Sequence, residues 1–182
     1  ERFIGYFPDS TGLGQISEMY GMLAYQNGDL QAAADSFDRA KGFPKADKER
    51  LMYLSGIVLF ELQRFEQGRA TFESLMAENK DSIYKDECLY RIALSYFYQN
   101  DYKNVTKSLQ TYIKENPKGN YLCDAKYRLA FIVFQEGKKD QAQEQLIKIT
   151  EEHPNDQNVG QVHALLGDIY NQKADYENAT KQ

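Results

Sequence analysis

A pattern of small and bulky residues recurs along this chain at a nearly constant interval. The small residue of each copy is Gly21, Gly56, Ala93, Ala130 and Gly167, so successive steps are 35, 37, 37 and 37 residues. A second small or apolar position follows in each copy, at Ala33, Gly68, Val105, Ala142 and Ala179. Four residues after it, the first four copies carry Phe37, Phe72, Leu109 and Leu146. Small residues let two helices approach closely and bulky ones fill the space beside them, so the register predicts a repeated packing unit.

Each copy has the periodicity of two amphipathic helices joined by a tight turn. In the third copy, apolar residues recur at helical spacing on either side of Asn100 and Asp101. The first series is Leu89, Ile92, Ala93 and Tyr96, and the second is Tyr102, Val105, Leu109 and Tyr112. This spacing places each series on one face of a helix. The sequence therefore predicts an all-α fold, a stack of about five helical hairpins.

The register divides the chain into consecutive repeats. Their predicted ranges are 15–47, 48–84, 85–121, 122–158 and a truncated fifth repeat at 159–182. Phe3 and Pro8 are spaced like Tyr112 and Pro117 at the end of the third repeat. Residues 1–14 are therefore expected to hold the tail of a preceding repeat, and the chain to be a fragment of a longer array.

The turn inside each hairpin differs between copies. Gly28 and Gly137 stand where a residue leaving the first helix adopts a left-handed conformation, which glycine accepts without steric cost. Asn100 holds this position in the third copy and tolerates it better than most residues. Gln63 holds it in the second copy, so that turn is expected to close without the freedom of glycine.

The composition argues against two classes of partner. The formal net charge is −5, and basic side chains are interspersed with acidic ones instead of forming a stripe. Binding of nucleic acid requires a basic face that neutralises phosphates, so no nucleic-acid partner is expected. Apolar runs such as residues 129–134 are far shorter than the ~20 residues that span a bilayer, so no membrane span is expected.

Residues that carry chemistry are few and scattered. His153 and His163 have no partners at catalytic or metal-ligand spacing, so each is expected to be a solvated or packed side chain. No phosphate-binding loop, nucleophile motif or zinc pattern occurs in the sequence. The segment is predicted to be non-enzymatic and to use no cofactor or metal. Cys88 and Cys123 are not a redox or metal-binding pair, which leaves either two free thiols or a disulfide between neighbouring first helices.

These repeats resemble the tetratricopeptide repeat family. That family carries Leu-Gly-x-x-Tyr on the first helix, then Ala-x-x-x-Phe on the second and a final proline, with a period of 34 residues. The matching residues are Leu166, Gly167 and Tyr170 in the last copy, Ala33, Phe37 and Ala40 in the first, and Pro117 and Pro154 at repeat ends. The resemblance implies a right-handed superhelical solenoid that binds protein partners.

The steps of 35 and 37 residues are longer than the usual period of 34, and this narrows the resemblance to one group within the family. Long repeats with proline turns and a Tyr-Arg-Leu-Ala string, as at Tyr127 to Ala130, are similar to those of bacterial envelope proteins such as outer-membrane assembly lipoproteins. This implies a periplasmic or outer-membrane-associated location, with the cytoplasm as the alternative. Cysteine usage does not decide between these compartments.

In the resembled family, the first helices line a concave groove. The corresponding positions of the second, third and fourth copies form an aromatic, apolar, aromatic row: Tyr53, Ile57, Phe60, Tyr90, Leu94, Phe97, Tyr127, Phe131 and Phe134. A solvent-exposed helix face would usually be polar, so the row predicts a groove that accepts a partner segment with apolar residues. Arg91 and Arg128 each follow a groove tyrosine, and they either steer an acidic partner residue or pair with local carboxylates.

Two other interpretations of this row stay open. The first helices can be buried all round by their neighbours, in which case the row belongs to the core. Alternatively, the array is an architectural spacer or docking module for another domain of a longer chain, or it self-associates as a homodimer. A dye that binds exposed apolar surface distinguishes an open groove from a filled one.

Overall fold

The computed structural model describes residues 12–172, and within this range it is helical without any strand. The helices are α2 (Leu13–Gln26), α3 (Leu30–Lys41), α4 (Lys48–Glu61), α5 (Phe65–Glu78), α6 (Lys85–Tyr98), α7 (Tyr102–Glu115), α8 (Leu122–Gln135), α9 (Lys139–Glu152) and α10 (Val159–Gln172). The predicted all-α stack of hairpins is confirmed. Most of the repeat tail expected at residues 1–14, and the second helix of the fifth repeat, lie outside the described residues.

The helices fall into two compact units. The first holds α2 to α6, and the second, which begins at Asp101, holds α7 to α10. The predicted third repeat, 85–121, thus contributes α6 to the first unit and α7 to the second. Each predicted range from 15 to 158 contains two helices, while the repeat boundaries themselves stay predictions.

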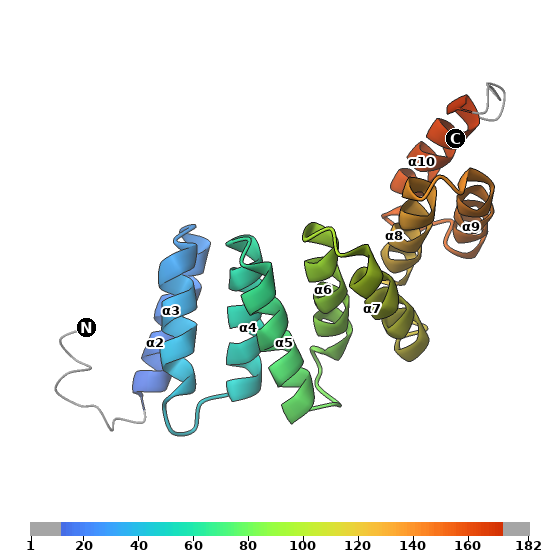
Figure 1. The fold of residues 1–182 in the computed structure, drawn as a ribbon. Helices are drawn as coiled ribbons and strands as arrows, with labels where there is room; N and C mark the ends of the chain where they lie inside the picture. The colour runs from blue at the N-terminus through green and yellow to red at the C-terminus, as the bar shows by residue number, and fades with distance from the viewer. Residues whose placement is uncertain (1–11, 173–182) are drawn as a thin grey trace. The chain divides into compact units, whose positions relative to one another are not determined.

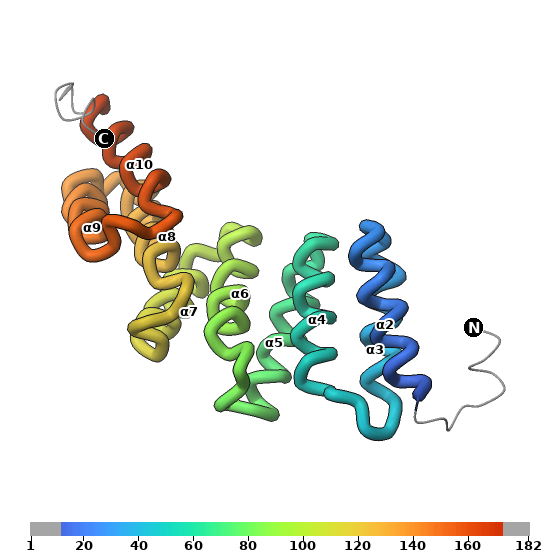
Figure 2. The backbone as a smooth tube through the Cα atoms, turned by 180° about the vertical axis from the view of Figure 1, so that it is seen from behind, coloured from blue at the N-terminus to red at the C-terminus, as the bar shows by residue number. Residues whose placement is uncertain are grey.

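In the first unit, the helices form two layers. α2, α4 and α6 are the first helices of their hairpins, and they lie side by side in one layer. α3 and α5 form the second layer (Figures 1 and 2). α3 packs against both α2 and α4, and α5 packs against both α4 and α6. A core cluster joins Ala33, Phe37 and Ala40 of α3 to Leu51 and Val58 of α4. Each second helix therefore connects two first helices.

Close packing within two hairpins depends on glycine. A Cβ atom on Gly21 would lie 2.7 Å from the ring of Phe37, and one on Gly56 would lie 2.4 Å from the ring of Phe72. Both rings are almost completely buried. The small residue of the first helix thus makes room for the bulky residue of the second, as the register predicted.

The second unit has the same construction. α8 packs against both α7 and α9, and α9 packs against α10. Ala130 of α8, Leu146 and Ile149 of α9, and Leu166 and Ile169 of α10 belong to one core cluster. The apolar faces predicted from helical spacing therefore meet inside the unit.

The turns share one backbone geometry. φ is 78° at Gly28, 79° at Gly137 and 56° at Asn100, all in the left-handed region. Gln63 takes the same conformation, with φ at 58°, and therefore carries a steric cost that glycine avoids. Two of the helices that follow these turns, α3 and α7, start with an aspartate side chain that accepts a backbone N–H bond, Asp29 and Asp101, and Asp47 caps α4 in the same way.

Candidate protein-binding surfaces

Six of the nine predicted groove positions lie in the first unit, on α4 and α6. Three of these side chains are buried, with 5 to 8% of their surface exposed: Phe60, Tyr90 and Leu94. The other three are half-buried: Tyr53, Ile57 and Phe97. The row on α4 and α6 is therefore an apolar strip in which half of the side chains are buried and half keep part of their surface accessible. Its role in partner binding stays a prediction.

Phe60 shows why part of the row is buried. Its ring lies 5.6 Å from the rings of both Phe65 and Phe72 on α5, measured between centroids. A Cβ atom on Gly68 would approach the Phe60 ring to 2.5 Å. Phe60 therefore packs into its own hairpin, and its burial depends on a glycine of the facing helix.

Tyr53 connects α4 to α6. Its ring stacks on Tyr84 at 4.1 Å between centroids, and its hydroxyl donates a 2.6 Å hydrogen bond to Glu87 Oε2. The other oxygen of Glu87 accepts a 2.7 Å bond from Arg91 Nε. Arg91 therefore pairs with a local carboxylate, which confirms one of the two alternatives for this residue, and a charged pair borders the apolar row.

A similar polar connection joins α2 to α4. The Tyr25 hydroxyl donates a 2.5 Å hydrogen bond to Glu61, and Arg50 forms a 3.0 Å ion pair with Glu18. The bond to Glu61, together with burial, raises the pKa of Tyr25 above its ordinary value, so the hydroxyl keeps its proton at neutral pH. The first-helix layer is thus bridged by tyrosine–glutamate and arginine–glutamate pairs.

The other three predicted groove positions lie on α8 in the second unit. Tyr127, Phe131 and Phe134 are half-buried and pack against the core cluster of this unit. The Arg128 side chain donates a 2.6 Å hydrogen bond to the buried Asp124, so this arginine also pairs locally. Burial raises the pKa of the Tyr127 hydroxyl. In the second unit too, an apolar row lies beside an arginine that is paired with a carboxylate of the same helix.

The sequence analysis missed an exposed apolar face on α2. Its four side chains expose 47 to 71% of their surface: Ile16, Met19, Tyr20 and Leu23. Their spacing of three, one and three residues places them on one helix face. This spacing was visible in the sequence, but only the tertiary structure shows that no described helix covers the face.

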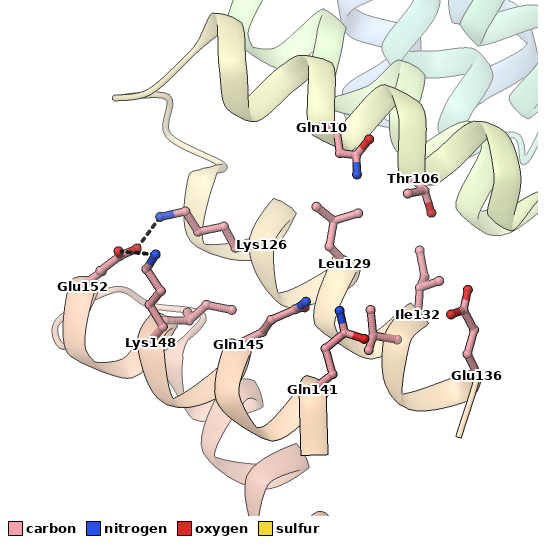
Figure 3. Close-up of a pocket in the computed structure, with 12 residues that line it drawn as sticks. Thr106, Gln110, Lys126, Leu129, Ile132, Glu136, Gln141, Gln145, Lys148 and Glu152 are labelled. Carbon is pink, nitrogen blue, oxygen red and sulfur yellow. Dashed lines mark hydrogen bonds and ion pairs between the residues drawn. The ribbon is translucent and has the colours of Figure 1, made fainter. Parts of the chain in front are cut away.

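The structure also contains a cleft that sequence reasoning did not find. It lies in the second unit, has a volume of about 470 Å³ and is lined by α7, α8 and α9 (Figure 3). Its lining includes glutamine side chains from α7 and α9 and apolar side chains from α8. The glutamines are ordinary surface residues in the sequence, so no local pattern brings them together.

Neither a metal-binding cluster nor a thiol of lowered pKa occurs within residues 12–172. These residues contain no cluster of three His, Cys, Asp or Glu side chains able to hold a metal ion. Cys88 and Cys123 are buried free thiols, and burial raises their pKa to about 12 and about 11, which disfavours the reactive thiolate. His153 Nε2 lies 3.0 Å from Lys126 Nζ at the end of α9. None of the described helices has the length and apolarity that a bilayer crossing requires.

The fold has close counterparts among solved structures. MamA from Desulfovibrio magneticus RS-1 has a TM-score of 0.71 and 17% sequence identity, over 92% of this chain and 89% of that one. Another MamA structure has a TM-score of 0.70 and 19% identity, over 94% and 88%. YrrB, described as a TPR protein with an unusual peptide-binding site, has a TM-score of 0.63 and 18% identity, over 100% and 88%. Identities this low show a shared fold alone, and no curated protein is significantly similar in sequence.

Family relationships are clearer at the level of repeats. Residues 45–182 match the tetratricopeptide repeat-like domain, and residues 14–48 match the tetratricopeptide repeat. The first match alone covers more than half of the chain, and the hairpins described above have the packing that such repeats require. The chain belongs to the tetratricopeptide repeat-like family.

Proposed function

We propose that this chain is a non-catalytic scaffold that binds a segment of a partner protein across its first-helix layer. The observation that carries the proposal is the apolar strip on α4 and α6, with partly accessible Ile57 and Phe97 side chains and the Arg91–Glu87 pair. An apolar surface with a charged border is typical of protein recognition sites. Membership in a family of protein-binding repeats supports the same function.

The buried and half-buried members of the row have different roles in this proposal. Phe60, Tyr90 and Leu94 form the rigid floor, because they are packed against the hairpin cores. Ile57 and Phe97 retain accessible surface and contact the partner. The Tyr127, Phe131 and Phe134 side chains offer a comparable surface within the second unit.

The size of this surface sets an expectation for affinity. Covering three aromatic side chains that each expose at most about a third of ~150 Å² contributes roughly 4 kcal/mol at ~25 cal/mol per Å². Association costs about 4–15 kcal/mol. A short partner segment should therefore bind in the micromolar range or more weakly, and tighter binding requires contact with further repeats.

The test is a capture experiment followed by a binding measurement. The unmodified chain, an Ile57→Ser/Phe97→Ser variant and the control Ile83→Ser are used to isolate partners from extract of the source cells. Ile83 is 85% exposed and lies outside the row, so its replacement controls for loss of surface apolarity. We expect a captured partner to bind the double variant at least about tenfold more weakly in titration calorimetry. Equal binding by all three folded proteins would contradict the proposal.

A second candidate function is favoured by the exposed face of α2, namely docking of an amphipathic helix. In the next hairpin, residues 35 positions further along, Leu51 and Val58, are covered by α3 and are 1% exposed. The occupant proposed for α2 is a helix that packs there as α3 packs on α4. This makes the chain a docking module for another domain or a second copy.

The dye ANS, which binds exposed apolar surface, tests this second function. A Met19→Lys/Leu23→Lys variant should lose most of the dye fluorescence of the unmodified chain, while Ile83→Lys should keep it. A stapled amphipathic helix should displace the dye, and sedimentation reports whether a second copy does so. Dye binding that survives in the α2 variant and disappears in Ile57→Ser would exclude docking at α2.

Sequence features of the repeats extend the proposal to a cellular location. Its long period and the string from Tyr127 to Ala130 are similar to envelope-type repeats, which supports a periplasmic or outer-membrane-associated scaffold. Fractionation of the source cells with a specific antibody tests this location. Co-purification with a cytoplasmic marker would contradict it.

A further inference from the structure

The cleft in the second unit lies on a different face from the predicted groove. Leu129 and Val133 of α8 line it, while Tyr127 and Phe131 of the same helix belong to the groove row. Residues two positions apart in an α-helix are separated by about 200° around its axis. The cleft is therefore a second surface, formed by the helices α7 and α9 on either side of α8 (Figure 3).

The walls and the floor of the cleft differ in polarity. Gln110 comes from α7 on one side, and Gln141 and Gln145 come from α9 on the other (Figure 3). The floor is apolar, with half-buried Leu129 and Val133 of α8 between the two walls. Amide-bearing side chains thus flank an apolar floor on both sides.

The amides in these walls are available to a ligand. The side-chain amides of Gln110, Gln141 and Gln145 make no hydrogen bond within residues 12–172. A glutamine amide offers both donors and an acceptor, which match the C=O and N–H groups of a peptide backbone. An extended chain leaves those backbone groups unpaired, whereas a helix has already used them.

The length of the cleft sets the length of an extended occupant. Its lining on α8 runs from Lys126 to Glu136, which is roughly 15 Å at ~1.5 Å per residue. This length matches about five residues of extended chain at ~3.3 Å each.

One end of the cleft has a surplus of positive charge. Lys126 Nζ lies 2.6 Å and Lys148 Nζ 3.7 Å from the carboxylate of Glu152, so two ammonium groups share one carboxylate (Figure 3). The hydrogen bond from Lys126 and both positive charges lower the pKa of Glu152, which keeps it ionised. Lys148 is 72% exposed and is therefore accessible to a second carboxylate.

We propose that this cleft binds an extended peptide segment of about five residues, with alternating apolar side chains and an acidic side chain at one end. The apolar side chains lie on Leu129 and Val133, the backbone bonds to the amides of Gln110 and Gln145, and the acidic group lies beside Lys148. This goes beyond the proposed function, because the site uses the opposite face of α8 and does not require the first-helix groove.

The test uses a fluorescein-labelled six-residue peptide with blocked ends that alternates valine or leucine with serine. Glutamate is placed at the first position in one version and at the last in another, with glutamine replacing it in a neutral version. Binding to the whole chain is measured by fluorescence anisotropy. We expect saturable binding, weakened at least about fivefold by Gln110→Leu/Gln145→Leu, since each hydrogen bond typically contributes a factor of about two to ten. The control Gln67→Leu replaces an exposed glutamine of α5 and should change nothing.

Charge at the end of the cleft is tested separately. One of the two glutamate-containing peptides should bind up to about fivefold more tightly than the neutral peptide at low salt. Lys148→Glu should remove this preference for the glutamate-containing peptide. Lys80→Glu makes the same charge change on an exposed residue of the first unit and should preserve it. The proposal is wrong if no peptide binds at millimolar concentration, or if a helical peptide of the same composition binds more tightly. It is also wrong if Ile57→Ser/Phe97→Ser abolishes peptide binding while Gln110→Leu/Gln145→Leu does not.

Discussion

Equivalent faces of α2 and α4 have the same place in the repeat but opposite environments. Ile16 and Leu23 of α2 are 47% and 54% exposed, whereas Leu51 and Val58, 35 residues further along, are 1% exposed. α3 covers the face of α4, and no helix described before α2 covers its counterpart. In a stacked array each repeat buries its apolar face against its neighbour. The apolar pattern of a first helix therefore cannot distinguish core from binding surface until the neighbour is known.

The two hairpins also differ at one turn position. Gly28 lies in the turn after α2 and Gln63 in the turn after α4, and both have left-handed backbones. Only glycine adopts this conformation without a steric penalty. The second hairpin thus tolerates local strain while its first helix is covered by α3, and the first hairpin has the unstrained turn but an uncovered face.

The largest expected effect comes from truncating the two equivalent apolar positions. Leu51→Ala should lower the free energy of unfolding by about 2–5 kcal/mol, because it leaves a cavity in a core cluster. Ile16→Ala should change it by less than about 0.5 kcal/mol, because the side chain is exposed. Urea unfolding followed by circular dichroism measures both values. A similar loss in both variants would mean that another part of the protein covers the α2 face in solution.

An intermediate effect is expected in α6, at the residue that has the same place in the repeat as Leu51. Cys88 lies 37 residues after Leu51, and burial raises the pKa of its thiol from 9.0 to about 12. The neutral thiol is favoured in the folded state, so its stabilising contribution is complete below about pH 9 and is lost as the pH rises toward 12. We expect Cys88 to contribute about 2–3 kcal/mol to the loss of stability between about pH 8.5 and pH 11, so the decline should be smaller by this amount in Cys88→Ala, where Cys123 still titrates.

Urea titrations at several pH values measure this difference. Cys123→Ala is the matched control, because it removes the other buried thiol and leaves Cys88 in place. If Cys88→Ala shows the same alkaline decline as the unmodified chain, then Cys88 is not buried in solution. The face of α6 would then be uncovered like that of α2, and not covered like that of α4.

The smallest effect is expected at the turns. Gln63→Gly should raise the free energy of unfolding by about 0.5–1 kcal/mol, since relief of left-handed strain exceeds the entropy cost of glycine. Gly28→Ala should lower it by about 1 kcal/mol, because alanine would have to adopt a φ of 78°. Thermal and urea unfolding of the pair check the opposite signs. Destabilisation by both substitutions would show that the Gln63 side chain contributes more than its backbone costs.

The hairpins could be predicted because the small and bulky positions are local and periodic. Gly56 and Phe72 meet as their register indicated, and each helix pair follows from spacing alone. Exposure within the groove row could not be predicted, because it depends on contacts between hairpins. Phe60 is buried by residues of α5, and Tyr53 is held by Glu87 from the next hairpin.

The sequence by itself determined the helices, their pairing and the family, because helical periodicity and turn chemistry act over distances of a few residues. The tertiary structure decided which apolar faces are covered and which polar side chains meet. The amides of Gln110 and Gln145 come from different hairpins and face one cleft, although 35 residues of chain separate them. Such surfaces depend on how helices of different repeats pack together, and no local sequence pattern specifies this packing.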